Sequence, residues 1–233
     1  MFLGKKILAI VPARGGSKGI PKKNLRKWNG LSLVGHVGRF CKRCKWIDAC
    51  CISTDDWKIG NEGKKHGLEF IFRRPWILSG DKVPSEAAWR HAWRTYERET
   101  GSFFDVSLLL EPTSPERQLS DIKKALGQLI KNKFSVVMTV EKVPLKYSAY
   151  KQLRIADSYG KLLLSSGKKI SRRQQLKETY IKNGSAYAVT RSFLKNPTYL
   201  LGSKKIGLVT TDHRINIDTF SDLKKNNASL LPS

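Results

Sequence analysis

The sequence of 233 residues lacks the features that mark membrane and secreted proteins. No apolar run approaches the roughly 20 residues that a membrane-spanning helix needs, which argues against an integral membrane protein. The first six residues lead straight into an apolar segment without a signal-peptide cleavage pattern, so we expect a cytoplasmic protein. Internal repeats and low-complexity tracts are also missing. With 40% hydrophobic residues, the chain can fold as one large α/β domain, alone or with a small appendage.

Acidic residues are scarce, since 19 Asp and Glu stand against 44 Lys and Arg and give a net charge of +25. Such an excess is typical of nucleic-acid-binding proteins and of enzymes that act on anionic substrates. The basic pairs are scattered along the whole chain, and no C2H2 or RNP signature is present. We therefore favour an enzyme, expect no specific nucleic-acid partner, and keep a nucleic-acid-binding module as the alternative.

Cysteine is confined to one short stretch. The four cysteines are Cys41 and Cys44, spaced C-x-x-C, followed by Cys50 and Cys51. This cluster admits a zinc site, although the spacing expected of a full ligand set is missing. The first two cysteines fall on the apolar stripe of a predicted helix, and the other two begin the apolar run of a predicted strand. Reduced thiols packed in the core are therefore the favoured interpretation.

Two common nucleotide-binding motifs, G-x-x-x-x-G-K-[ST] and G-x-G-x-x-G, are absent. A different glycine-rich loop follows residues 7–11, whose unbroken apolar run predicts a strand buried on both faces. Three glycines let the backbone N–H groups of this loop approach an anion, and four cations supply positive charge. These residues are Gly15, Gly16, Gly19, Arg14, Lys18, Lys22 and Lys23. We interpret the stretch 7–24 as a nucleotide triphosphate site, with a basic surface turn as the alternative.

The rest of the chain alternates predicted helices and strands. Further strands are expected over 49–53, 68–72, 105–110, 135–140, 183–190 and 206–210. Helices are expected over 31–45, from a cap at 54–56 to about 66, over 84–100 and 119–133, and after 222. This order predicts a doubly wound, mostly parallel sheet. Residues 143–180 break the pattern and predict an inserted antiparallel arm between a core, 1–142, and its return with a C-terminal helix, 181–233.

Ligands of such sheets bind beyond the carboxyl ends of the strands, so we expect the loops at 12–24, 53–56, 73–85 and 111–117 to converge. Short polar segments mark these loops and three later positions. They are Ala13-Arg14-Gly15-Gly16-Ser17-Lys18-Gly19-Ile20-Pro21, Lys23-Asn24, Ser53-Thr54-Asp55, Arg74-Pro75, Pro112-Thr113-Ser114-Pro115 with Arg117, Arg173-Gln174-Gln175, Asn183-Gly184 with Tyr187, and Ile217-Asp218-Thr219. In order and spacing they resemble the CMP-N-acylneuraminate synthetases, the nonulosonic acid cytidylyltransferases, over nearly the whole chain.

The resemblance implies a Rossmann-like nucleotidyltransferase that moves CMP from CTP to the anomeric hydroxyl of a nine-carbon, sialic-type sugar acid. Pyrophosphate would be released, Mg²⁺ would be the cofactor, and the CMP-sugar would serve surface glycan synthesis. It also implies a homodimer in which the arm is a dimerisation arm that reaches the partner's sugar pocket.

The resemblance also implies a role for each matching residue. Nucleotide binding would fall to Arg14, Ser17, Lys18, Lys23, Asn24, Arg74 and Ser85. The sugar acid would be surrounded by Glu111, Thr113, Lys146, Arg173, Asn183 and Tyr187. Magnesium would be held by Asp218 and Asn216, and the catalytic residues would be Lys18, Lys23 and Asp218. Each role has a simpler alternative. Asp218 could do no more than cap the last helix. Asp55, in the loop at 53–56, could be a helix cap as readily as a site residue.

Two positions depart from the family pattern. Asn216 stands where an aspartate usually accompanies Asp218, and an amide oxygen brings no charge to a magnesium ion. Glu111 stands where a glutamine usually contacts the sugar, and an ionised carboxylate can only accept hydrogen bonds. The acceptor is therefore expected to differ from N-acetylneuraminate, with legionaminic acid or another modified nonulosonic acid as candidates. A CMP-Kdo synthetase and a catalytically weak homologue remain alternatives.

Overall fold

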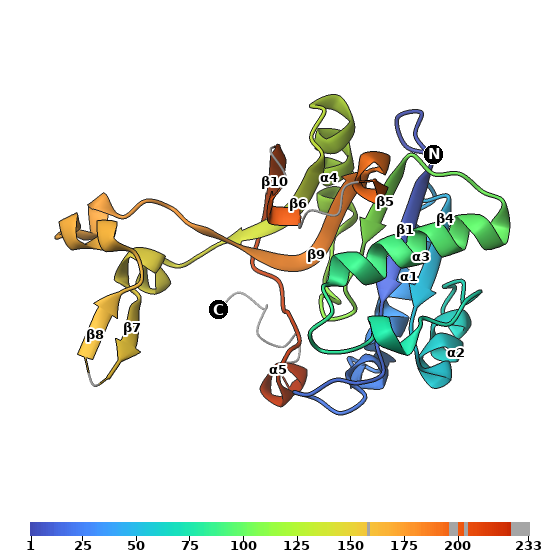
Figure 1. Ribbon diagram of the computed structural model, residues 1–233, viewed down its shortest axis with the longest axis horizontal. Coiled ribbons are helices and arrows are strands. Elements are labelled where there is room, and N and C mark those ends of the chain that lie inside the picture. The colour runs from blue at the N-terminus through green and yellow to red at the C-terminus, as the bar shows by residue number, and fades with distance from the viewer. Residues whose placement is uncertain (158, 196–199, 203–204, 225–233) are drawn as a thin grey trace.

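The computed structural model describes residues 1–157, 159–195, 200–202 and 205–224 (Figure 1). Its centre is a six-stranded sheet in the order β10-β6-β9-β5-β1-β4. These strands are β1 (Ile7–Pro12), β4 (Ala49–Ser53), β5 (Val106–Leu109), β6 (Val136–Lys142), β9 (Tyr180–Thr190) and β10 (Ile206–Thr211). Strand β9 runs antiparallel to β5 and β6, and the other neighbours are parallel. The predicted doubly wound, mostly parallel sheet is confirmed.

Helices cover both faces of this sheet. They are α1 (Leu33–Arg43), α2 (Trp57–Lys65), α3 (Ser85–Thr100) and α4 (Leu119–Lys131). Alternate side chains of β1 point to opposite faces. Ile7 packs in the core beneath α1, α2 and α4, whereas Leu8 packs in the core beneath α3, beside Trp89 and Trp93. Among the residues described, none of the helices has both the length and the apolar character needed to cross a bilayer.

Two predicted elements differ from the structure. The helix expected over 31–45 begins at Leu33, because a short hairpin of β2 (Lys27–Trp28) and β3 (Leu31–Ser32) precedes it. Its turn residues, Asn29 and Gly30, both have positive φ, as a tight hairpin turn requires. The strand expected over 68–72 is wrong, since only an isolated bridge joins Glu69 to Cys51. The aromatic ring of Phe70 packs instead against Trp57 of α2.

The stretch predicted as an arm projects away from the sheet (Figure 1). It leaves after β6 and carries the antiparallel hairpin of β7 (Leu153–Ala156) and β8 (Tyr159–Leu162). Apolar side chains of this hairpin are exposed, including Leu153 at 64% and Ile155 at 82%. The exact bounds of the arm and its role in dimerisation stay predictions. Beyond β10, α5 spans Phe220–Lys224, and the closing helix expected after 222 lies for the most part outside the described residues.

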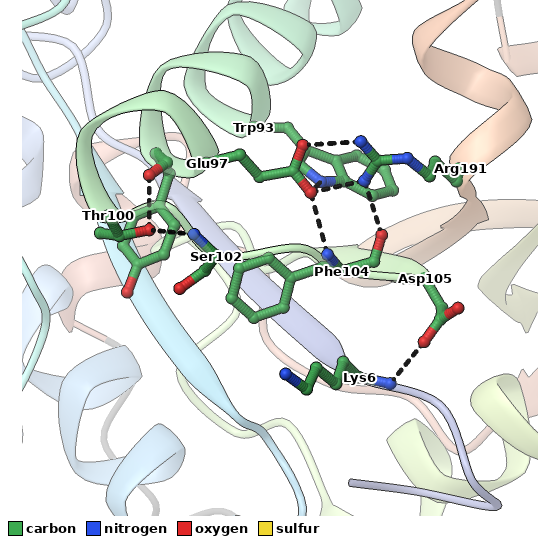
Figure 2. Close-up of polar contacts among 9 residues, drawn as sticks. Lys6, Trp93, Glu97, Thr100, Ser102, Phe104, Asp105 and Arg191 are labelled. Atoms are coloured by element: carbon green, nitrogen blue, oxygen red, sulfur yellow. Dashed lines mark hydrogen bonds and ion pairs between the residues drawn. The ribbon is translucent and has the colours of Figure 1, made fainter.

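The C-terminal end of α3 is fixed to the segment that follows β9 (Figure 2). Arg191 donates to Glu97 Oε2 at 2.9 Å and to the carbonyl of Phe104 at 2.8 Å. Its guanidinium also lies 3.7 Å from the centre of the Phe103 ring. Burial acts to raise the pKa of Glu97, but the hydrogen bonds from Arg191, Phe104 and Trp93 outweigh it and lower that pKa. This network holds the C-terminal end of α3 against the segments before β5 and after β9.

The cysteines pack in the core, as predicted. All four are buried and reduced. Cys41, Cys44 and Cys50 belong to the core beneath α1, whereas Cys51 belongs to the core beneath α3. Because neighbouring residues of a strand point to opposite faces, Cys50 and Cys51 face opposite sides of the sheet. This placement does not gather the four thiols around one metal ion.

Candidate active site

A cavity of about 570 Å³ opens beyond the carboxyl ends of β1 and β5. Its walls come from the loop after β1, the loop before α3, the loop after β5 and the segment before α5. The predicted site residues that line it are Arg14, Ser17, Lys18, Lys23, Asn24, Arg74, Ser85, Glu111, Thr113 and Asp218. Strands that run in parallel end at the same edge of the sheet, which is why loops distant in sequence meet here.

The glycine-rich loop is held in place by its backbone. The N–H of Gly15 donates to Asp55 Oδ1 at 2.9 Å, and Asn24 Nδ2 donates to the carbonyl of Arg14 at 2.9 Å. Asp56 rather than Asp55 caps α2, because its carboxylate accepts from the N–H groups of the first turn. Asp55 therefore supports the site by holding the glycine-rich loop. The buried Asn24 holds the same loop through the hydrogen bond from its side-chain amide.

A small core joins the loop to the segment that carries Asp218. It consists of Ile20, Trp28, Leu33 and Ile217. The backbone N–H of Ile217 donates to the carbonyl of Thr113 at 2.8 Å, which ties in the loop after β5 as well. A Cβ atom at Gly19 would lie 3.0 Å from the carbonyl oxygen of Asp218, so glycine permits this close approach. The glycine-rich loop, the loop after β5 and the segment with Asp218 are thus fixed next to one another.

Where these segments adjoin, Lys23 contacts Asp218, one of the two predicted metal ligands. Lys23 Nζ donates to Asp218 Oδ1 at 2.9 Å. Asn216 Nδ2 donates to Asp218 Oδ2 at 2.6 Å, so the two residues lie side by side. The Asp218 side chain is 59% exposed and faces the cavity.

These residues fit a magnesium ion only in part. Among the described residues, no group of three or more His, Cys, Asp and Glu side chains is placed to hold a metal. One carboxylate and one amide supply two ligand groups, and Mg²⁺ typically combines one or two carboxylates with substrate phosphates and water. The donor set of Asp218 and Asn216 therefore suits a metal that arrives with a polyphosphate.

Arg74 is a buried cation at the base of the cavity. Its Nε donates to Ser53 Oγ at 3.0 Å, and its backbone N–H donates to the carbonyl of Thr54 at 2.8 Å. Burial lowers the pKa of Arg74 to about 10, which still leaves the guanidinium charged at neutral pH. Together with the glycine-rich loop, it makes the cavity suited to an anionic nucleotide.

A second cavity, of about 290 Å³, adjoins the first, because Ser85 and Glu111 line both. Its polar wall includes Tyr187 and Lys182, and its apolar wall is formed by Leu109, Met138, Leu200 and Leu201. Burial raises the pKa of Glu111, although the charge of Arg117 acts in the opposite direction. A compact polar molecule in this cavity would lie next to a nucleotide in the first.

Residues 8–227 match the family model described as cytidylyltransferase. This chain belongs to the cytidylyltransferase family. One relative of this cytidylyltransferase is a post-translational flagellin modification protein B of Campylobacter coli, 31% identical over 94% of this chain and 91% of its own length. Another is a CMP-N,N'-diacetyllegionaminic acid synthase of Campylobacter jejuni, 30% identical over 94% of this chain and 91% of its own length.

A solved structure with the same fold is that of CMP:2-keto-3-deoxy-manno-octonic acid synthetase complexed with CTP. It covers 94% of this cytidylyltransferase and 95% of its own chain, with a TM-score of 0.70 and 17% sequence identity. At that identity the likeness establishes the fold, with its mostly parallel sheet.

Some predicted site residues lie elsewhere in the cytidylyltransferase. Asn183 is a buried residue of β9, where its Nδ2 donates to Thr211 Oγ1 at 2.8 Å and its Oδ1 accepts from Thr139 Oγ1 at 2.7 Å. Lys146 and Arg173 belong to the projecting arm, and within the part of the chain described neither lines the two cavities. Their predicted roles toward the sugar remain predictions.

Asp81 is a residue of the first cavity that sequence reasoning missed. Its Oδ1 pairs with Arg14 Nη2 and its Oδ2 with Lys18 Nζ, both at 2.7 Å. A signal was available, because Asp81 is the only acidic residue between positions 70 and 85, in a loop rich in cations and apolar residues. Lys182 of the second cavity was also missed, although it directly precedes Asn183 in a predicted site segment.

Proposed function

We propose that this cytidylyltransferase transfers CMP from CTP to a nonulosonic acid and releases pyrophosphate, giving a CMP-activated sugar for surface glycan synthesis. The observation that carries the proposal is the pair of adjoining cavities, one lined by Arg14, Lys18 and Lys23 and the other by Glu111, Lys182 and Tyr187. The named legionaminic acid synthase among the relatives supports the choice of acceptor class.

In this proposal the first cavity binds CTP. Arg14, Ser17 and Lys18 receive the triphosphate, and Arg74 and Ser85 lie on the nucleoside side. Lys23 contacts the phosphates where negative charge develops as pyrophosphate departs, which is the position where a fixed cation lowers the barrier most. Its ion pair with Asp218 at 2.9 Å holds the ammonium inside the cavity before the nucleotide arrives.

The second cavity receives the sugar acid with its anomeric hydroxyl directed toward the first. Glu111, Tyr187 and Lys182 line this cavity, so the first two would hydrogen-bond the hydroxyl groups of the sugar acid and Lys182 would pair with its carboxylate. The attacking hydroxyl must lose a proton as it bonds to the α-phosphorus. Asp218 stands at the cavity wall as the carboxylate that helps to activate it.

Magnesium fits this arrangement as a companion of CTP. Asp218 and Asn216 would hold it, because Asp218 lines the cavity and the amide of Asn216 lies next to its carboxylate. When bound, the ion would neutralise charge on the reacting phosphates as a Lewis acid.

We also propose that the enzyme is a cytoplasmic homodimer. The projecting arm supports this proposal, because its exposed apolar residues, such as Ile155 at 82%, suit burial against a second copy. Lys146 and Arg173 of one arm would then reach the sugar cavity of the partner. A cytoplasmic location suits an enzyme whose substrate, CTP, is made there.

A panel of sugar acids tests the function. The purified protein, CTP and Mg²⁺ are mixed with N-acetylneuraminate, legionaminic, pseudaminic and Kdo acids, and pyrophosphate release is measured. We expect release with a modified nonulosonic acid, and ATP or GTP in place of CTP serves as the control. Preference for Kdo would assign the alternative acceptor, and no release with any acid would overturn the proposal in favour of a catalytically weak homologue.

A further inference from the structure

Asp81 places a carboxylate where the proposed triphosphate site has its cations. The two Asp81 oxygens pair separately with Arg14 Nη2 and Lys18 Nζ, each at 2.7 Å. All three residues line the first cavity. A carboxylate and a phosphate accept the same charge-assisted hydrogen bonds from guanidinium and ammonium groups. Asp81 therefore occupies donors that a polyphosphate would need.

The loop that carries Asp81 is fixed at both ends. Before it, the N–H of Arg74 donates to the carbonyl of Thr54 at 2.8 Å, and after it α3 begins at Ser85. Between these ends, the N–H of Val83 donates to the carbonyl of Gly80 at 3.2 Å in a turn around Asp81. The turn places the carboxylate at the cavity wall, in contact with Arg14 and Lys18 of the glycine-rich loop.

The ion pairs of Asp81 are exposed enough to solvent for another anion to replace the carboxylate. Its side chain is 39% exposed, that of Arg14 is 34% exposed, and that of Lys18 is 82% exposed. The hydrogen bond from Lys18 is the main reason that the pKa of Asp81 lies below its ordinary value. The ionised Asp81 carboxylate thus forms two solvent-exposed ion pairs, and such pairs are weak. A triphosphate with several negative charges can displace the carboxylate from both cations.

We propose that Asp81 is the resident counter-anion of the polyphosphate site. It holds Arg14 and Lys18 together while the site contains no nucleotide, yields them to the β- and γ-phosphates of the substrate, and takes them back as pyrophosphate leaves. Asp81 is thus a positioning residue that acts through the two cations and promotes product release. The inference rests on the proposed function only in taking the polyphosphate to be that of CTP.

Binding of inorganic pyrophosphate and tripolyphosphate, measured by calorimetry, tests the role without any turnover. Asp81→Asn keeps the size of the side chain and removes its charge. The matched control is Glu99→Gln, which changes the net charge equally near the C-terminal end of α3, where Glu99 pairs with Arg98. We expect Asp81→Asn to bind both anions about threefold to tenfold more tightly, the effect of losing two exposed ion pairs that compete with them. Glu99→Gln should bind them like the natural protein.

Steady-state kinetics give the second readout. In Asp81→Asn, the KM for CTP and the inhibition constant of pyrophosphate should fall together, while kcat should fall or stay constant because the product leaves more slowly. Equal or weaker binding of pyrophosphate by Asp81→Asn would overturn the inference, and so would an equal gain in Glu99→Gln. If pyrophosphate binding tightens as expected but no acceptor supports turnover, the inference about Asp81 stands and the proposed function fails.

Discussion

Position 216 offers a sharp test of the proposed metal site. In the structure, Asn216 Nδ2 donates to Asp218 Oδ2 at 2.6 Å, so an aspartate at this position would set two carboxylates side by side. Because Asp218 is 59% exposed, their interaction is largely screened by water. Two unit charges about 4 Å apart in water interact by about 1 kcal/mol, and a divalent cation between them would gain a similar amount from the added charge. Asn216→Asp should therefore lower the Mg²⁺ concentration for half-maximal rate about fivefold.

The assay is a Mg²⁺ titration of the initial rate of pyrophosphate release at saturating CTP, for the natural protein, Asn216→Asp and Asp218→Asn. Asp218→Asn is the matched control, since it makes the opposite change at the neighbouring position, and it should lose nearly all activity. A retained rate in Asp218→Asn would remove Asp218 from the metal site. An unchanged or raised Mg²⁺ requirement in Asn216→Asp would refute the reasoning about position 216.

Three further predictions concern the phosphate cation, the arm and the fold. Lys23→Ala should lose at least about 2 kcal/mol of transition-state stabilisation in kcat/KM, whereas the exposed neighbour Lys22→Ala should not; equal rates for both would remove Lys23 from catalysis. Mixed subunits of Lys23→Ala and Arg173→Ala should regain activity that neither variant has alone, and no recovery after proven subunit exchange would contradict a shared site. Glu97→Gln should lower the free energy of unfolding in urea by about 2 kcal/mol at pH 7, because it weakens the charged hydrogen bonds to Arg191. The folded-state pKa of Glu97 is lowered, so this stabilisation is present above the unfolded pKa and is lost as pH falls through the folded one; a difference that persists at low pH would contradict the assignment.

Much of the fold was predictable because it depends on local patterns. The apolar run over 7–11 indicated a strand buried on both faces, and its side chains do pack into two cores. The run over 68–72 was misleading. Hydrophobicity alone does not distinguish a strand of the sheet from an extended segment whose side chains, such as Phe70, pack on a helix. The hairpin before α1 was missed although Asn29 and Gly30 form a common turn dipeptide, because its strands are only two residues long.

The site was predictable where residues adjoin in sequence and less so where loops meet in space. Arg14, Lys18 and Lys23 of the glycine-rich loop do line one cavity with Asp218, as the topology of a parallel sheet requires. The ion pairs of Asp81 with Arg14 and Lys18 join loops more than 60 residues apart, and no local pattern encodes such a pairing. Likewise, only the folded chain shows that Asp55 bonds to the glycine-rich loop while its neighbour caps α2.

The fate of the acceptor oxygen tests the central claim most directly. The acceptor that supports turnover is labelled with ¹⁸O at its anomeric hydroxyl, and both products are analysed by mass spectrometry. If the hydroxyl attacks the α-phosphorus of CTP, the label stays in the CMP-sugar and the pyrophosphate contains none. Label in the pyrophosphate, or consumption of CTP to CMP without a labelled CMP-sugar, would contradict the proposed transfer.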